Sequence, residues 1–331
     1  MEGCSKDKIR YIQFCMMSKS KIFTGKNFMI AAAVSFAAAM VAFPSVTETG
    51  TKSAILIWLN SIVPVLLPFF IFADFLKEVV DMERIPTKIY PLLMAILSGY
   101  PIGAKAAGDL VKSGMLDGPS GRHVVSYSLV TGPAFILGTT GIFLGSNKAA
   151  AVVAAAHYLG ALCNGRMWRS NRKRQDDNYG KIYKTMIKLE KKSLMDIFTR
   201  SILNGFKSMA FILAWLIIFM ISADLLEMAG ILDYFPNSIW RSVAKGLLEM
   251  TMGINALCMC NINLPLKTML TSFIISFGGL SVIGQAISIS GEWLGAIDLI
   301  KIKITHGLFA GIIAFLIIIS GNTIFQGDFL L

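Results

Sequence analysis

The sequence predicts an all-α polytopic membrane protein made of two inverted structural repeats with broken and re-entrant helices. Of its 331 residues, 55% are hydrophobic and only 15% are charged, with a mean hydropathy of +0.64. That is more apolar side chain than the interior of a soluble domain can hold, so lipid is the expected solvent. In addition, glycine and proline interrupt apolar runs at comparable places in the two halves, which is typical of transporters built from repeats.

Apolar runs of membrane-spanning length recur along the whole chain. The seven predicted spans are 28–43, 53–76, 123–145, 147–165, 203–226, 268–290 and 298–320. Two shorter, glycine-rich stretches, 89–112 and 243–266, are predicted to be re-entrant. The predicted domains are therefore a basic N-terminus (1–27), a first repeat with a leading span (28–165), a basic linker (166–200) and a second repeat (201–331).

The basic residues predict the orientation. Lys and Arg are concentrated in residues 1–27 and 166–200, although the net charge of the chain is +11. Short cytoplasmic loops carry such an excess, so we expect both segments, including the N-terminus, to be cytoplasmic. The linker suits either an amphipathic helix on anionic lipid or a solvated loop. Because the positive charge lies in loops, we expect the lipid bilayer rather than nucleic acid as a partner.

The two interruptions lie about 146 residues apart, within segments 129–138 and 275–284. A second correspondence, at an offset of 150, places Asp74 opposite Asp224 and Gly103 opposite Gly253. Backbone released from a helix at membrane depth persists only where protein buries it or where it lines a cavity. With the predicted topology the two repeats run in opposite directions, and a solute site is expected where their breaks meet.

Candidate ligand-binding residues cluster at these breaks. Lys105 is expected in the first turn of a helix that follows Pro101, where it adds to the positive end of the helix dipole and favours an anion. An interfacial lysine that reaches to water is the alternative. The predicted solute-binding residues are Lys105, Gly103, Thr131, Gly132, Gly278, Gly279, Ser281 and Gln285. Hydroxyl groups also satisfy freed helix carbonyls without any ligand, so a structural role stays open for them.

Three carboxylates are candidates for ion coupling: Glu249, Asp74 and Asp224. A carboxylate near the bilayer centre costs about 2.5–3.5 kcal/mol on insertion scales, so Glu249 is expected to have a partner or to be protonated. The two aspartates lie at predicted helix ends, where a structural role as caps is favoured over ion coupling.

Enzyme chemistry is not expected. The chain has no phosphate-binding loop of the G-x-x-x-x-G-K-[ST] type and no H-E-x-x-H zinc motif. Its five cysteines and three histidines show no metal-ligand spacing. We therefore predict no catalytic residues, no metal and no cofactor.

Three motifs resemble a known family. They are Ser-Gly-Tyr-Pro-Ile-Gly-Ala-Lys (98–105), Thr-Gly-Pro-Ala-Phe-Ile-Leu-Gly (131–138) and Ser-Phe-Gly-Gly-Leu-Ser-Val (276–282). Together they resemble the nucleoside-recognition (Gate) domain family, and within it the branch of sporulation integral membrane proteins of the YlbJ type. The resemblance covers roughly residues 30–320. Ile283 stands where the family commonly has histidine, and Met252 where asparagine would be unsurprising.

The resemblance implies a membrane protein of endospore-forming bacteria, in the cell membrane or the membrane enclosing the forespore. That branch is associated with moving dipicolinate, a planar aromatic dianion, toward the developing spore. We therefore expect a permease for a small organic anion that works by alternating access. The alternatives are a carrier of nucleosides or other neutral solutes, and a non-transporting gate or assembly subunit that binds another sporulation membrane protein.

Overall fold

The computed structural model describes residues 27, 29–79, 85–169, 193–290 and 293–321, and every regular element in these ranges is helical. The basic segment at 1–26 and most of the linker lie outside them. The chain divides into two compact units, Met1–Gly50 and Thr51–Leu331. In the first, the described residues form the helix Met29–Ala42 and the start of α2 (Pro44–Ile57).

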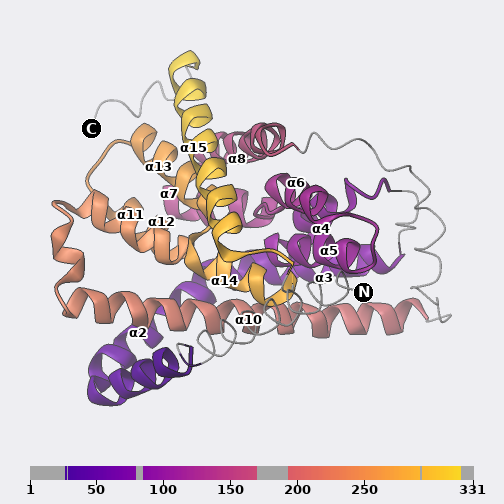
Figure 1. The fold of residues 1–331 in the computed structure, drawn as a ribbon. Coiled ribbons are helices and arrows are strands. Elements are labelled where there is room, and N and C mark those ends of the chain that lie inside the picture. Colours follow the sequence, from indigo (N-terminus) through magenta and orange to yellow (C-terminus); the bar gives the residue numbers. More distant parts are fainter. Residues whose placement is uncertain (1–26, 28, 80–84, 170–192, 291–292, 322–331) are drawn as a thin grey trace, which may run out of the picture. The chain divides into compact units, whose positions relative to one another are not determined.

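The second unit holds the remaining helices (Figure 1). They are η1 (Trp58–Ile62), α3 (Val63–Val79), α4 (Tyr90–Ser98), α5 (Tyr100–Lys112), α6 (Gly118–Ser128), η3 (Ala134–Thr139), α7 (Thr140–Leu144), α8 (Asn147–Met167), α10 (Leu194–Met228), η5 (Ile231–Tyr234), α11 (Ser238–Leu248), α12 (Met250–Met259), α13 (Leu264–Phe277), α14 (Gly279–Ser290) and α15 (Ala296–Ser320).

Within the described ranges, four helical stretches are long and apolar enough to cross a membrane: Pro44–Val79, Leu194–Met228, Leu264–Ser290 and Ala296–Ser320. They coincide with four of the seven predicted spans. The predicted span 28–43 is a shorter apolar helix, and 123–145 is divided among α6, η3 and α7. The span predicted at 147–165 is the single helix α8, which is 21 residues long. The all-α membrane fold is thus confirmed, whereas the inversion of the repeats stays a prediction.

Both predicted interruptions are present as helix breaks. Helix α6 ends at Ser128, and the chain is not helical again until η3 begins at Ala134. Between α13 and α14, Gly278 and Gly279 have φ angles of +84° and +79°. L-residues avoid this left-handed region because of their Cβ atom, so the glycines permit the bend.

The two segments predicted to be re-entrant are helical hairpins. Helices α4 and α5 meet at Gly99, which has a φ of +81°, and α11 and α12 meet at Glu249. In each pair the second helix packs back on the first through a glycine. Gly103 lies against Ala95, and Gly253 lies against Gly246. The two hairpin breaks are 150 residues apart, as the sequence correspondence predicts.

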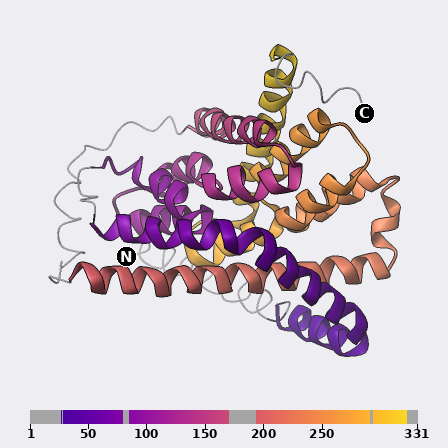
Figure 2. The same ribbon diagram turned by 180° about the vertical axis from the view of Figure 1, so that it is seen from behind.

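Two groups of helices surround these hairpins. Helix α3 packs along α10 (Figure 2), and the Trp58 indole nitrogen in η1 donates to the Met209 carbonyl of α10 over 3.0 Å. Helices α8, α13 and α15 pack against one another, and α14 packs on α5. The second group therefore joins helices from both predicted halves.

Candidate functional site

An inner cavity of about 320 Å³ lies where the broken helices of both halves come together. Its wall takes residues from all four breaks and from α3 and α10. The residues at or just after the breaks that line it are Ser98, Gly99, Tyr100, Thr131, Gly132, Glu249, Thr251 and Ser281, and Gln285 lines it from within α14. The size is at the small end of the range typical of small-molecule sites.

Most of the inner cavity is apolar and aromatic. Phe69 and Phe70 of α3, Phe135 of η3, and Phe211 and Trp215 of α10 contribute to its wall. A few polar groups converge on this surface, which is the usual composition of a site that binds a small molecule.

Gln285 and Glu249 are the most informative polar groups of the inner cavity. The Gln285 side chain is 3% exposed, and its Oε1 atom has no hydrogen-bond partner within the described part of the chain. A buried acceptor without a partner is costly, so a ligand that completes it would bind favourably. Glu249 is 5% exposed and caps α12, since its Oε2 accepts from the Met252 backbone amide over 2.7 Å.

The two hairpins differ at this position. Glu249 occupies the N-cap of α12, whereas the matching N-cap of α5 is Gly99, which provides no side-chain cap. The first residues of α5 line the inner cavity. The positive end of the α5 dipole is therefore open toward the cavity, and the equivalent end of α12 already has a carboxylate.

An outer cavity of about 760 Å³ adjoins the inner one. Phe70, Ser98, Ile102, Lys207 and Ser208 line both. The charged residues of the outer cavity are Lys77, Lys105, Lys112, Lys207, Asp74 and Asp109. The lining of the outer cavity thus contains four lysines and two aspartates, and this excess of positive charge attracts anions.

Lys105 belongs to the outer cavity and does not line the inner one. Helix α5 begins at Tyr100, so Lys105 lies in its second turn instead of the first turn that the sequence predicted. Its side chain is exposed. The lysine shared by the two cavities is Lys207 of α10. Nothing in the local sequence separates Lys207 from an ordinary interfacial lysine at the start of an apolar run.

The four glycines predicted to bind the solute have different surroundings. Gly132 lines the inner cavity. A Cβ at Gly103 would lie 2.6 Å from the Ser128 carbonyl oxygen, so this glycine permits α5 to approach the end of α6. Gly278 and Gly279 form the α13–α14 bend, and a Cβ at Gly279 would lie 2.9 Å from the Leu248 carbonyl oxygen.

The two predicted coupling aspartates lie in different places. Asp74 lines the outer cavity, where its Oδ1 pairs with Lys77 over 2.7 Å and its Oδ2 accepts from the Asn204 amide over 2.9 Å. Asp224 lines neither cavity. It lies one turn before Glu227, near the end of α10.

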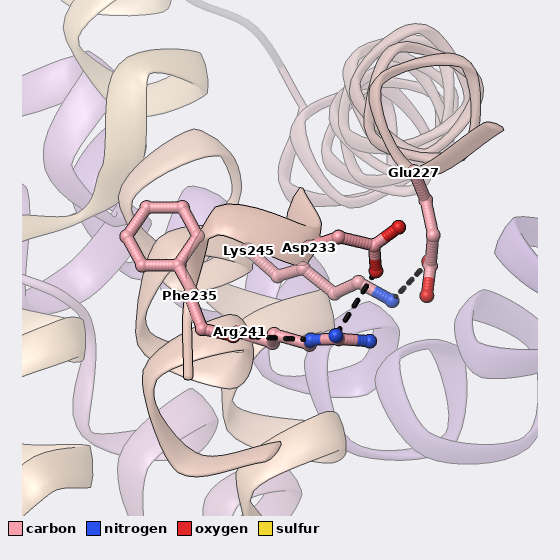
Figure 3. Close-up of polar contacts among 5 residues, drawn as sticks. All are labelled: Glu227, Asp233, Phe235, Arg241 and Lys245. Carbon is pink, nitrogen blue, oxygen red and sulfur yellow. Dashed lines mark hydrogen bonds and ion pairs between the residues drawn. The ribbon is translucent and has the colours of Figure 1, made fainter. Parts of the chain in front are cut away.

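A cluster of ion pairs lies between the end of α10 and the start of α11 (Figure 3). Lys245 pairs with Glu227 over 2.7 Å, and Arg241 pairs with Asp233 over 2.9 Å. The Arg241 Nε atom also donates to the Phe235 carbonyl over 3.4 Å. These contacts connect α11 to the end of α10 and to η5, and they explain the local charges without a solute.

A buried histidine connects two of the breaks. His157 of α8 is fully buried; its Nε2 accepts from the Thr131 amide over 2.9 Å, and its Nδ1 lies 2.7 Å from the Ser276 hydroxyl. Because Nε2 is the acceptor, the ring proton of the neutral form is on Nδ1 and is donated to Ser276.

Side chains from α8 and α15 also satisfy the carbonyls at the α6 break. The Lys303 ammonium group donates to the Leu129 carbonyl over 3.0 Å, and the Tyr158 hydroxyl donates to the Thr131 carbonyl over 2.9 Å. Asn164 donates to the Ser126 carbonyl over 2.7 Å. The broken segment is therefore buried in protein, and several of its carbonyls have side-chain donors, as suits backbone at membrane depth.

Comparison with known proteins gives one informative similarity. The chain is 22% identical over 298 residues to the sporulation integral membrane protein YlbJ of Bacillus subtilis (strain 168), an alignment that covers 77% of this chain and 73% of that protein. No family model matches the chain, and no solved structure matches it. The similarity supports the predicted YlbJ type, and with it an integral membrane protein that acts in sporulation. Membership of the Gate-domain family stays a prediction.

Proposed function

We propose that this YlbJ-type membrane protein is a permease for a small organic anion, with dipicolinate as the first candidate solute, during endospore formation. The observation that carries the proposal is the inner cavity, which is lined by residues from the four helix breaks of both halves. Interrupted helices that meet at a cavity are the usual construction of a solute site in secondary transporters. Alternating access between the two repeats would expose this cavity to each side in turn.

Three features favour an anion. The outer cavity holds four lysines against two aspartates, Lys207 extends this positive charge to the inner cavity, and the N-terminus of α5 is uncapped beside it. A lysine and an open helix N-terminus both stabilise a carboxylate. The aromatic side chains of the inner cavity provide flat apolar surface for a planar ring.

In the proposed transport cycle, Glu249 couples the movement of the anion to that of a proton. An ionised Glu249 in the inner cavity would repel an anionic solute, and its burial already penalises the charge. The amides at the start of α12 stabilise the ionised form when the cavity is empty. Entry of the anion would therefore shift Glu249 toward its protonated form, so that solute and proton move together.

Uptake of labelled dipicolinate into proteoliposomes tests this function. We expect saturable uptake that increases when the proton gradient is directed inward. Lys207→Met should reduce uptake at low dipicolinate concentration by about tenfold, because losing one partly screened charge contact costs about 1–2 kcal/mol. Lys105→Met should have a smaller effect, and Lys148→Met, whose exposed side chain lines neither cavity, serves as the control.

Glu249→Gln isolates the coupling step. We expect this variant to retain uptake and lose the response to the proton gradient, because the amide is neutral at every pH. Uptake in Lys207→Met at the wild-type level would remove Lys207 from the route. A proton-gradient response that persists in Glu249→Gln would remove Glu249 from coupling.

A carrier of nucleosides or other neutral solutes is the second candidate, and the polar groups of the inner cavity favour it. The Gln285 carbonyl oxygen lacks a donor among the described residues, and Glu249 is another acceptor on the same wall. A solute with N–H or O–H groups would complete both. Competition of labelled dipicolinate uptake by unlabelled nucleosides separates the two candidates. Absence of any uptake in liposomes that contain folded protein would favour the partner-dependent subunit.

A further inference from the structure

The buried lysine at the α6 break has no part in the function proposed above. Lys303 is 2% exposed and lies within α15, one of the stretches long and apolar enough to cross a membrane. An ionisable residue at such a position is costly and is usually functional. None of the described carboxylates forms an ion pair with it.

The negative partner of Lys303 is the backbone of the broken helix. Its Nζ atom donates to the Leu129 carbonyl over 3.0 Å, and Leu129 is the C-cap of α6. The C-terminus of a helix carries about half a negative charge on its unpaired carbonyls. The neighbouring Ser128 hydroxyl is fully buried and has no hydrogen-bond partner in the described part of the chain.

Two histidines lie close to this amine, and the hydrogen bonds of one of them, His157, require its neutral form. His157 must accept at Nε2 from the Thr131 amide. The Nε2 atom of His306 lies 2.9 Å from the His157 carbonyl, which can only accept, so that nitrogen carries the proton. The two rings are 4.8 Å apart. A positive charge on the His306 ring would face Lys303 at close range, which disfavours it, so Lys303 is the group of this cluster best placed to carry a positive charge.

Backbone carbonyls at the ends of interrupted helices coordinate the coupling sodium ion in transporters with broken helices. We propose that the Lys303 ammonium group is a tethered cation, which occupies such a sodium position at the α6 break and makes transport independent of sodium. The transport part of this inference rests on the proposed function; the occupancy of the position by a cation does not.

Thermal unfolding of the purified protein tests the cation position without any transport. The variant Lys303→Ala leaves the Leu129 carbonyl without its donor and leaves the position of the ammonium group empty. We expect its Tm to be lower than that of the wild type and to rise with added sodium chloride but not with choline chloride, because a bound ion stabilises only the folded state. The wild type and Lys301→Ala, an exposed lysine on the same helix, should respond equally to both salts. An equal response of Lys303→Ala to the two salts would overturn the proposal.

Transport provides the second test. Wild-type uptake should be unchanged when choline replaces sodium, and a requirement for sodium would overturn the proposal. Lys303→Gln can still donate to the Leu129 carbonyl through its amide, so it keeps the fold in case the alanine variant does not form. We expect it to lose at least tenfold in uptake, since it lacks the charge, and uptake at the wild-type level would also overturn the proposal. If the wild type shows no uptake at all, the function fails, and the thermal measurement still decides the cation position.

Discussion

Replacing Gly103 by alanine should destabilise the protein, whereas the same change at Gly132 should not. A Cβ at Gly103 would lie 2.6 Å from the Ser128 carbonyl oxygen and 2.7 Å from the Ala95 Cβ. Ordinary contacts of this kind are 3.4–4 Å long, so α5 would have to move away from α4 and α6 by most of an ångström. A Cβ at Gly132 would lie 3.4 Å from the Ile96 carbonyl oxygen, which is an ordinary contact.

Overpacking a close helix contact costs about 1–3 kcal/mol. For a chain of 331 residues, this cost should lower the Tm of Gly103→Ala by roughly 1–4 °C, on the scale known for soluble domains. The assay is heating in detergent followed by size-exclusion chromatography of the protein that stays folded. Gly132→Ala should leave the Tm unchanged and reduce uptake, because the new methyl group stands in the wall of the inner cavity. Equal Tm values for the two variants would refute the assignment of Gly103 to packing.

Three further outcomes follow from single contacts. Gly279→Ala should lower the free energy of unfolding by about 1–2 kcal/mol because of the left-handed backbone alone, and by more because the new Cβ would lie close to the Leu248 carbonyl. The control in the same thermal assay is Gly295→Ala, since Gly295 lies in open space and has a φ of −71°. Gln285→Leu should change the stability by less than about 1 kcal/mol, because the Oε1 atom has no partner to lose, and should abolish uptake; retained uptake would exclude Gln285 from binding. Glu227→Gln should lower the free energy of unfolding by less than about 1 kcal/mol, since its ion pair with Lys245 is partly exposed. The difference in stability between this variant and the wild type should shrink in high salt.

The helix breaks could be predicted from sequence because their cause is local. Glycine at 278 and 279 permits positive φ angles whatever surrounds it, and the residues around Gly99 and Pro101 end one helix and begin another. The offset of 150 that matches Gly103 with Gly253 also relates the two hairpin breaks, at Gly99 and Glu249. Such signals depend on a few neighbouring residues, which a single sequence displays.

The site itself depends on contacts between residues far apart in the sequence. Lys207 lines the inner cavity only because α10 packs along α3 next to the α4–α5 hairpin. Likewise, Lys303 meets the Leu129 carbonyl across 174 residues. From sequence, a lysine near the start of an apolar run is typical of the membrane interface. No local pattern distinguishes that position from a buried one.

The buried hydrogen bonds limit which helices can move when the cavity opens. His157 and Lys303 connect α8 and α15 to the α6 break, and His157 also contacts α13 through Ser276. Water cannot replace these bonds at such depth, so separating the helices would leave buried polar groups without partners, at a cost of about 1–3 kcal/mol each. Alternating access that preserves them moves α8 together with α13 and α15.

The side of the cavity formed by α3 and α10 has fewer such bonds. Its polar contacts join α3 and η1 to α10 itself, through Asn204 and Trp58, while mainly apolar residues of the two helices face the inner cavity. We therefore expect α3 and α10 to move as a pair relative to the α4–α5 hairpin.

Cross-linking across the cavities tests this movement. Ser98 of α4 and Ser208 of α10 line both cavities. Replacing both by cysteine, in a background without the native cysteines, allows a short bifunctional maleimide to join them. The cross-linked double variant should lose uptake while either single variant treated in the same way retains it. Undiminished uptake after complete cross-linking would show that the cavity opens elsewhere.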